Sequence, residues 1–191
     1  MNRRQSGKKL IVLFLLALAP PASAQKGFPT TTVIVGGQPM ASDRELPENL
    51  AASADHRVLL GLLRSSGLLE QLHGRGPFTL FAPTDAAFAA LPLGELDRLR
   101  APDNKAALRD VLALHIVPGN FSSKRMLLLL RGVKSVELET LGGAELTLGT
   151  NGPRNLTLRD PSGDMAGIVL YDVKQANGVL FVIDRVLQPA G

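Results

Sequence analysis

The sequence predicts an α+β domain, with helices in the first part of the chain and a sheet in the second. Apolar residues recur at the 3.6-residue period of helices up to about Leu130, and at the two-residue period of strands beyond it. The nearly continuous apolar run from Val179 to Leu187 predicts a strand at the centre of the sheet. The chain has no internal repeat, so we expect one module rather than a tandem array.

The first 24 residues have the layout of a secretory signal peptide. Basic residues precede an apolar run from Leu10 to Ala19, and Ala22-Ser23-Ala24 matches the small-residue cleavage motif. The apolar run is too short to span a membrane. We therefore expect cleavage near Ala24 and a mature chain that is secreted or periplasmic, with no stable membrane span.

The charge of the chain argues against nucleic acid as a partner. The formal net charge is +4, but four of the 21 Lys and Arg residues and none of the 17 Asp and Glu residues lie in the first 24 residues. The rest of the chain therefore carries 17 charges of each sign and lacks the basic footprint of a nucleic-acid binder. The absence of cysteine also excludes disulfides, thiol nucleophiles and zinc–thiolate sites.

Residues 25–48 predict a tether, or an arm laid against the domain, because glycines and prolines surround a short β-forming stretch at Thr32–Val35. The domain itself is predicted over residues 49–189. Its first convincing helix begins near Ser53 or Asp55, either of which can cap it. A glycine then stops this helix, and a short leucine-rich turn follows.

A strand, a breaker and a capped helix follow within the segment GPFTLFAPTDAAFAAL. Residues that favour strands run from Phe78 to Ala82, and Pro83 cannot extend their ladder. Thr84 or Asp85 can cap the helix that comes next. None of these residues points to a reaction, so we interpret the segment as a packing device. Its structural residues are Phe78, Phe81, Pro83, Thr84, Asp85 and Phe88.

Three further helices precede the strands. The leucine spacing predicts short helices over residues 93–99 and 103–114. Ser122 or Ser123 can cap the last helix, whose consecutive leucines at 127–130 we expect to be largely buried. Short alternating segments separated by glycine, asparagine and proline turns then complete the predicted sheet.

Three segments together resemble the fasciclin family: GPFTLFAPTDAAF from Gly76, LHIVPG from Leu114 and NGVLFVIDRVLQP from Asn177. Their order and spacing are similar to the family's two signature boxes with its Tyr-His motif between them, and the resemblance covers about Thr32 to Pro189. It implies a fasciclin-like β-wedge or sandwich with several helices packed on one side. It also implies a short secreted single-domain bacterial protein, from a family that acts outside cells in adhesion and in matrix or surface contact.

The chain departs from the family pattern at two positions. Leu114 replaces the tyrosine of the Tyr-His pair, and Phe181 stands where the family commonly has a histidine. In animal members, the Tyr-His region and an Asp-Ile pair are proposed as integrin-contact elements. The resemblance therefore makes His115, Asp172 and Val173 candidate partner contacts, although each of the two pairs is only half kept.

His115 follows and precedes apolar residues, so we expect it to be buried. Its ring nitrogens then need partners such as a backbone carbonyl or the side chains of Thr84 or Asp85. A structural role is our main interpretation, and contact with a ligand is the alternative. Asp184 is predicted to accept hydrogen bonds from backbone or hydroxyl donors, because it interrupts an apolar run. The structural residues of the second box are Asn177, Gly178 and Asp184.

The sequence predicts no catalytic residue, no metal site and no cofactor. There is no G-x-S-x-G motif, and the three histidines offer no pair at i, i+4 spacing. Asp160 and Asp164 bracket a turn that lacks the further acids of a calcium loop. Glu137 and Glu139 alternate on one strand face, which is typical of a solvated face.

These observations predict a secreted, non-enzymatic adhesion or interaction module that contacts a cell surface, a matrix polymer or a secreted protein. Its partner would be a protein or polysaccharide. The alternative is a small-molecule or lipid carrier, in which the leucine-rich helices at 53–72 and 124–130 line an apolar groove.

Overall fold

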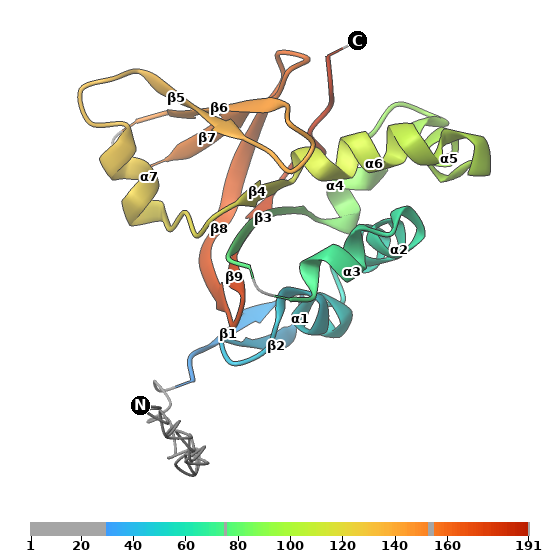
Figure 1. Ribbon diagram of the computed structural model, residues 1–191, viewed down its shortest axis with the longest axis horizontal. Coiled ribbons are helices and arrows are strands. Elements are labelled where there is room, and N and C mark those ends of the chain that lie inside the picture. Colours follow the sequence, from blue (N-terminus) through green and yellow to red (C-terminus); the bar gives the residue numbers. More distant parts are fainter. Residues whose placement is uncertain (1–29, 75, 153–154, 191) are drawn as a thin grey trace, which may run out of the picture.

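The computed structural model describes residues 30–74, 76–152 and 155–190 (Figure 1). The predicted signal peptide at 1–24 and the start of the predicted arm at 25–29 lie outside the described residues. The helices are α1 (Leu46–Ala52), α2 (Arg57–Ser66), α3 (Leu68–Leu72), α4 (Asp85–Ala89), α5 (Glu95–Arg100), the 3-10 turn η1 (Pro102–Asn104), α6 (Lys105–Leu114) and α7 (Ser123–Leu129). The strands are β1 (Thr32–Val35), β2 (Gln38–Ala41), β3 (Phe78–Pro83), β4 (Ile116–Pro118), β5 (Ser135–Glu139), β6 (Glu145–Thr150), β7 (Leu156–Arg159), β8 (Met165–Gln175) and β9 (Gly178–Ile183).

A seven-stranded sheet forms the centre of the molecule, in the order β4-β3-β9-β8-β7-β6-β5. Strands β3 and β9 pair in parallel, with Phe78 opposite Gly178, and the other pairs in this sheet are antiparallel. Every residue of β9 is buried and the strand lies between β3 and β8, which confirms the predicted central strand. It ends at Ile183 rather than at Leu187, so Asp184 lies just past its end.

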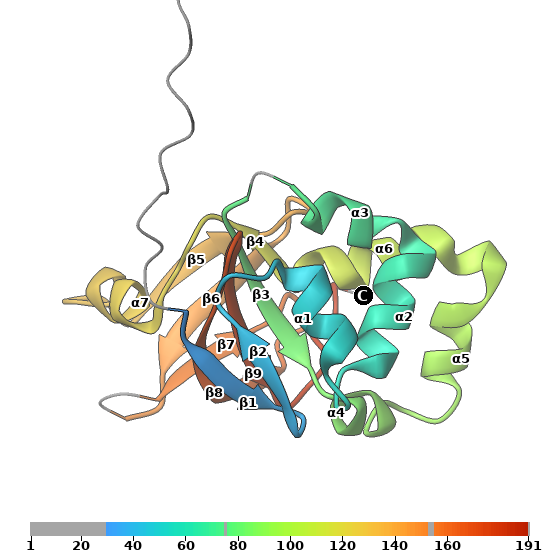
Figure 2. The same ribbon diagram turned by 90° about the horizontal axis from the view of Figure 1, so that it is seen from below.

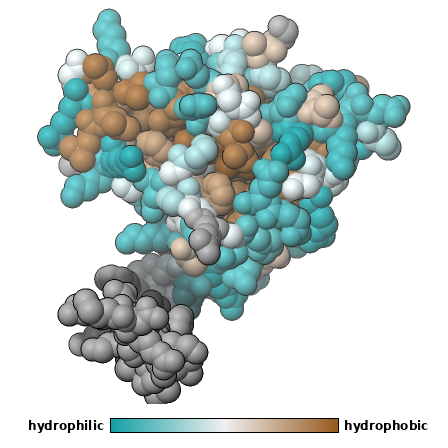
Figure 3. Space-filling model, viewed as in Figure 1, coloured by the Kyte–Doolittle hydropathy of each residue, from teal (hydrophilic) through white to brown (hydrophobic). Residues whose placement is uncertain are grey.

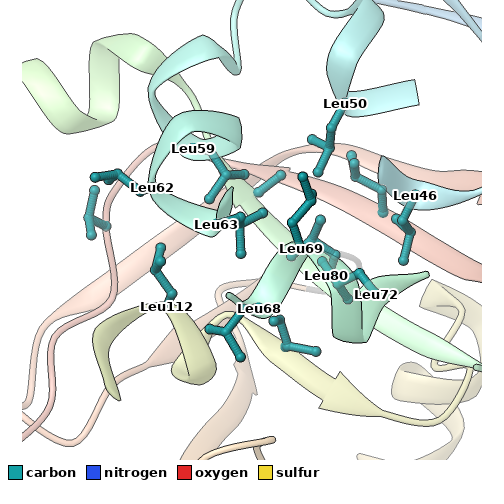
Figure 4. Packing of buried hydrophobic residues seen from close by; sticks show 14 of the residues in the cluster. Leu46, Leu50, Leu59, Leu62, Leu63, Leu68, Leu69, Leu72, Leu80 and Leu112 are labelled. Carbon is teal, nitrogen blue, oxygen red and sulfur yellow. The ribbon is translucent and has the colours of Figure 1, made fainter. Parts of the chain in front are cut away.

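Helices α1 to α6 gather on one side of the sheet (Figure 1). This confirms the α+β class that the sequence predicts and the wedge with helices on one side that the family resemblance implies. The leucines of these helices meet Leu80 of β3 in a first core cluster, which Figure 4 shows from close by. A second core cluster surrounds Phe81 and Phe181 and includes Met126 of α7. Helix α7 itself lies at the opposite end of the molecule from α2, α3 and α5 (Figures 1 and 2).

Strands β1 and β2 form a separate two-stranded hairpin that packs against the domain. Val35 and Met40 of this hairpin are buried in the first core cluster. Asn49 of α1 fixes the hairpin, since its Oδ1 accepts a hydrogen bond from the Ala41 N–H at 3.1 Å and its Nδ2 donates to the Ala41 carbonyl at 2.8 Å. The same Nδ2 donates to the side chain of Gln175 in β8. The hairpin, α1 and β8 are therefore linked by one buried amide.

Two predicted helix starts are wrong. Helix α1 was not predicted, because Pro47 suggests a break, yet proline is tolerated in the first turn of a helix and occupies that place here. The next helix, α2, begins after His56, which is buried at its N-cap position. Helix α5 begins at Glu95 after a left-handed glycine, and Leu93 lies before it, fully exposed.

The burial predicted for the leucines of α7 is also wrong. Leu128 and Leu129 are 46% and 41% exposed. Consecutive residues 127–130 span more than one turn of a 3.6-residue helix, so they cannot all face the core. Met126 occupies the buried position, and Leu127 and Leu130 pack only partly against the second core cluster.

Candidate functional site

The first box builds a strand, a corner and the starts of two helices. Strand β3 ends at Pro83, and Thr84 is the N-cap of α4, where its Oγ1 accepts a hydrogen bond from the Ala87 N–H at 3.2 Å. Asp85 does not cap this helix. Its Oδ1 accepts a hydrogen bond from the Val58 N–H at 2.9 Å, in the first turn of α2. The carboxylate therefore provides an acceptor for a free backbone N–H at the start of α2, a helix that lies far from Asp85 in the sequence.

The aromatic residues of the first box lie in the core. Phe81 and Phe88 are buried, and Phe78 is partly buried against the first core cluster. The ring centroids of Phe81 and Phe181 are 5.6 Å apart, so the phenylalanine that replaces the family's histidine completes an apolar cluster. These side chains contribute packing and offer no exposed polar group to a partner.

Asn177 joins three segments of the chain. Its Oδ1 accepts a hydrogen bond from the Leu46 N–H at 3.0 Å, and its Nδ2 donates to the Leu72 carbonyl at 2.7 Å. Its own carbonyl accepts from the Phe78 N–H at 3.0 Å. Gly178 lies against the same strand, because a Cβ there would be 2.0 Å from the Phe78 oxygen. The start of the second box thus locks β9 to β3 and to the helices.

Replacing Asn177 by alanine should lower the free energy of unfolding by about 2–4 kcal/mol, because the partly buried Leu46 N–H and Leu72 carbonyl lose their partner. Urea unfolding followed by circular dichroism measures this loss. The matched control is the exposed Asn151, whose replacement by alanine should change stability by less than about 0.5 kcal/mol. Equal effects of the two substitutions would contradict the bridging role of Asn177.

His115 is fully buried at the end of α6 and has two backbone partners. Its Nδ1 lies 2.8 Å from the Val111 carbonyl, and its Nε2 lies 3.0 Å from the Leu187 nitrogen. Because the Leu187 N–H can only donate, Nε2 accepts and Nδ1 carries the proton. Burial lowers the pKa of His115 to about 4, against smaller opposing effects of the Val111 carbonyl and the Asp160 carboxylate. The neutral ring therefore ties the C-terminal segment to α6.

Two further carboxylates organise the same end of the molecule. Asp184 is exposed, and its Oδ1 accepts a hydrogen bond from the Gly167 N–H of β8 at 2.8 Å. Asp160 is buried, and its carboxylate accepts from the Asp164 N–H at 3.0 Å and from the Gln188 N–H at 2.8 Å. Both carboxylates therefore hold backbone segments in place.

Asp172 lies at an irregularity of β8. The pairing of β8 with β9 shifts register between Leu170 and Val173, and Asp172 has a φ of 55°, which few residues other than glycine adopt. Its carboxylate accepts hydrogen bonds from the hydroxyl of Ser123 and from the Ser123 N–H, the latter at 2.7 Å. Among the candidate partner contacts, Asp172 is thus bound to α7, whereas His115 and Val173 have no exposed surface.

An open groove of about 650 Å³ lies beside this irregularity. Thr79 of β3 holds the loop that carries Asn120, since its Oγ1 donates to the Gly119 carbonyl at 2.7 Å and accepts from the Phe121 N–H at 2.9 Å. A second cavity of about 390 Å³ shares three lining residues with it. We call the larger one the Lys174 groove and define it by Asn120, Ser122, Lys124, Asp172, Lys174 and Gln175.

A third cavity, of about 340 Å³, lies between α4 and the segment after β9, and its lining includes Asp184 and Arg185. The apolar groove considered for a lipid carrier is not formed between the two helical segments proposed to line it. Helices α2 and α3 lie at the opposite end of the molecule from α7 (Figures 1 and 2), and most of their leucines are buried in the first core cluster.

The described part of the chain holds no group of three or more His, Asp or Glu side chains that could bind a metal ion. In residues 30–74, 76–152 and 155–190, no helix is long and apolar enough to cross a membrane.

Apart from Asp172, the polar residues of the Lys174 groove were not predicted as a site. Asn120, Lys124 and Lys174 come from a loop, a helix and a strand that are separate in the sequence. Asn120 directly follows the LHIVPG segment and Lys124 stands beside Arg125, but no sequence motif links either of them to Lys174. Only the tertiary structure brings them together.

Comparisons with known proteins agree with this fold. The fasciclin domain family matches residues 54–189. The chain is 33% identical over 175 residues to Protein sll1483 of Synechocystis, and the match covers 91% of this chain and 90% of that protein. It is 32% identical over 149 residues to the cell surface glycolipoprotein MPB83 of Mycobacterium bovis, which covers 73% of this chain but 60% of that protein.

More distant relatives include animal proteins. The chain is 31% identical over 133 residues to the transforming growth factor-beta-induced protein ig-h3 of Sus scrofa, covering 69% of this chain and 17% of that protein. The solved FAS1 domain pair from the insect cell adhesion molecule fasciclin I has the same fold, with a TM-score of 0.67 at 18% identity over 75% of this chain and 50% of that chain. From the match over residues 54–189 and these relatives, the chain belongs to the fasciclin domain family.

Proposed function

We propose that this chain is an exported, non-enzymatic binding module that contacts an acidic protein or polysaccharide at a cell surface or in a matrix through the Lys174 groove. Relatives with informative names are a cell surface glycolipoprotein and a cell adhesion molecule. The two boxes and His115 are occupied by packing and internal hydrogen bonds, which supports a binding role over a catalytic one.

The observation that carries the proposal is the set of exposed donors in this groove. The exposed ammonium groups of Lys124 and Lys174 lie beside the exposed Asn120. The nearby carboxylate of Asp172 accepts hydrogen bonds from the start of α7, and within the described residues it makes no salt bridge with these lysines. Carboxylates and hydroxyls are the groups that such donors bind.

Retention on the cell envelope tests this proposal. The chain recovered from the export fraction of a bacterial host should bind saturably to envelope or extracellular polymer of its source organism. Replacing Lys174 by Glu together with Asn120 by Ala should weaken retention about tenfold, which corresponds to about 1.4 kcal/mol, because an attraction becomes a repulsion and a donor is lost.

The matched control reverses a charge on a distant exposed surface. Replacing Arg100 of α5 by Glu should leave retention unchanged, and all variants should unfold at the same temperature as the wild type. Retention that is equal in the groove variant and the wild type would rule out this groove as the contact surface.

A further inference from the structure

The outer end of α7 carries an apolar patch that the Lys174 groove does not use. Leu128, Leu129 and Val133 are 46%, 41% and 53% exposed, and we call these residues the α7 patch. None of the three cavities described above includes them in its lining. Figure 3 shows apolar surface gathered at this end of the molecule, with hydrophilic side chains at its border. The patch therefore projects outward from the molecule.

The patch lies within a basic segment of an otherwise balanced chain. Residues 124–134 contain four Lys or Arg residues and no Asp or Glu. One of these, Arg125, is held over the Phe121 ring at 4.5 Å. The exposed Lys124, Arg131 and Lys134 make no salt bridge within the described residues. Three free cations thus border the exposed leucines and valine.

Asp172, which is bound to Ser123, and Glu137, three residues after Lys134, form no ion pair with these cations within the described residues. Asp172 accepts hydrogen bonds from Ser123, as described above. Glu137 of β5 accepts a hydrogen bond from the Thr147 hydroxyl at 2.9 Å. The α7 end therefore presents positive charge and apolar surface together.

We propose that the α7 patch docks on a membrane surface that contains anionic phospholipids. Leu128, Leu129 and Val133 would enter the boundary between head groups and acyl chains, while Lys124, Arg131 and Lys134 contact lipid phosphates. The charge of the segment is complementary to such a surface. Of these cations only Lys124 also lines the Lys174 groove, so the contact made by Arg131 and Lys134 does not depend on what the groove binds.

Other partners match only part of the patch. A polyanion without apolar groups would contact the cations and leave the exposed leucines in water, and a neutral apolar surface would leave the cations without partners. An acidic amphipathic peptide has both groups, but helical peptides are typically held in an apolar groove. The α7 patch lines none of the cavities described above. An anionic bilayer contacts both kinds of group without requiring a groove.

Vesicle co-sedimentation tests this inference on protein from the export fraction, with its N-terminus read by mass spectrometry. The wild type should bind vesicles that contain about one third phosphatidylglycerol, and it should bind phosphatidylcholine vesicles far more weakly. Replacing Arg131 and Lys134 together by Gln should weaken binding about 30-fold, the factor for two lost cations. Replacing Leu128 and Leu129 together by Gln should weaken it about tenfold or more.

Two controls match these changes elsewhere on the surface. The fully exposed Leu93 is replaced by Gln, and the exposed cations Arg100 and Lys105 are replaced together by Gln. Both controls should bind within about twofold of the wild type at equal salt. Thermal unfolding must be the same in all variants, so that a loss of binding reports the surface and not the fold.

Several results would overturn the inference. The first is a folded wild type that does not bind anionic vesicles, and the second is equal binding to both kinds of vesicle. The third is a leucine variant that binds like the wild type, because this would indicate a purely ionic contact. Binding of the patch to an acidic amphipathic peptide but not to vesicles would replace the membrane by a protein partner.

Discussion

Replacing Gly178 by alanine should lower the free energy of unfolding by roughly 4 kcal/mol or more and the unfolding temperature by about 10 °C. A Cβ at this position would lie 2.0 Å from the Phe78 oxygen and 2.9 Å from its carbonyl carbon. Both atoms belong to the backbone of β3, which pairs with β9 at the centre of the sheet. The clash can be relieved only by separating these strands, because no flexible side chain is available to move.

Gly61 is the matched control for this substitution. It lies exposed in the middle of α2, and a Cβ there would meet no atom within 4 Å. Replacing it by alanine should raise the free energy of unfolding by about 0.5–1 kcal/mol, because alanine favours a helix over glycine. A loss below about 1 kcal/mol for the Gly178 variant would mean that β3 and β9 are not held so closely.

Lowering the pH from about 7 to about 4 should lower the free energy of unfolding by about 3 kcal/mol, because the low pKa of His115 in the folded protein favours unfolding at acidic pH. The pKa of this histidine is about 4 in the folded protein, whereas its ordinary value is 6.5. Between pH 4 and 6.5 this histidine is protonated in the unfolded chain but neutral in the folded chain. The free energy of unfolding therefore rises with pH over this range. The contribution is complete above pH 6.5 and lost by about pH 4.

Replacing His115 by Gln isolates this effect, because glutamine does not titrate and still offers a donor and an acceptor to Val111 and Leu187. Burial also lowers the pKa of His56. This residue therefore makes the free energy of unfolding rise with pH in the wild type and in the His115→Gln variant alike. Urea unfolding at several pH values should show a steeper pH dependence in the wild type than in the variant. Identical slopes would mean that His115 titrates alike in the folded and unfolded chains.

Sequence reasoning predicted the fold where one local pattern determines the packing. The apolar run of β9 places it at the centre of the sheet, and Thr84 caps the helix that follows Pro83. It failed where a distant segment decides the outcome. Asp85 lies beside a capping residue, yet it satisfies the start of α2, and only the tertiary structure shows this.

The candidate contact surface was less predictable than the scaffold. The resemblance to animal relatives selected His115 and Val173, whose side chains the fold buries completely. The exposed lysines of the Lys174 groove, Lys124 and Lys174, belong to no shared motif, because binding groups on such modules need only a position on the surface. The leucines of α7 were expected in the core because a large exposed apolar patch is unusual on a soluble protein. The expectation failed because four apolar residues in a row exceed what one helix face can bury.

The most direct measurement compares the Lys174→Glu and His115→Gln variants in the envelope-retention assay, at neutral pH and at a temperature where both are folded. If packing and partner contact reside in different residues, Lys174→Glu loses retention with an unchanged unfolding temperature, and His115→Gln keeps retention with altered stability. Full retention by Lys174→Glu together with loss of retention by folded His115→Gln would contradict this separation.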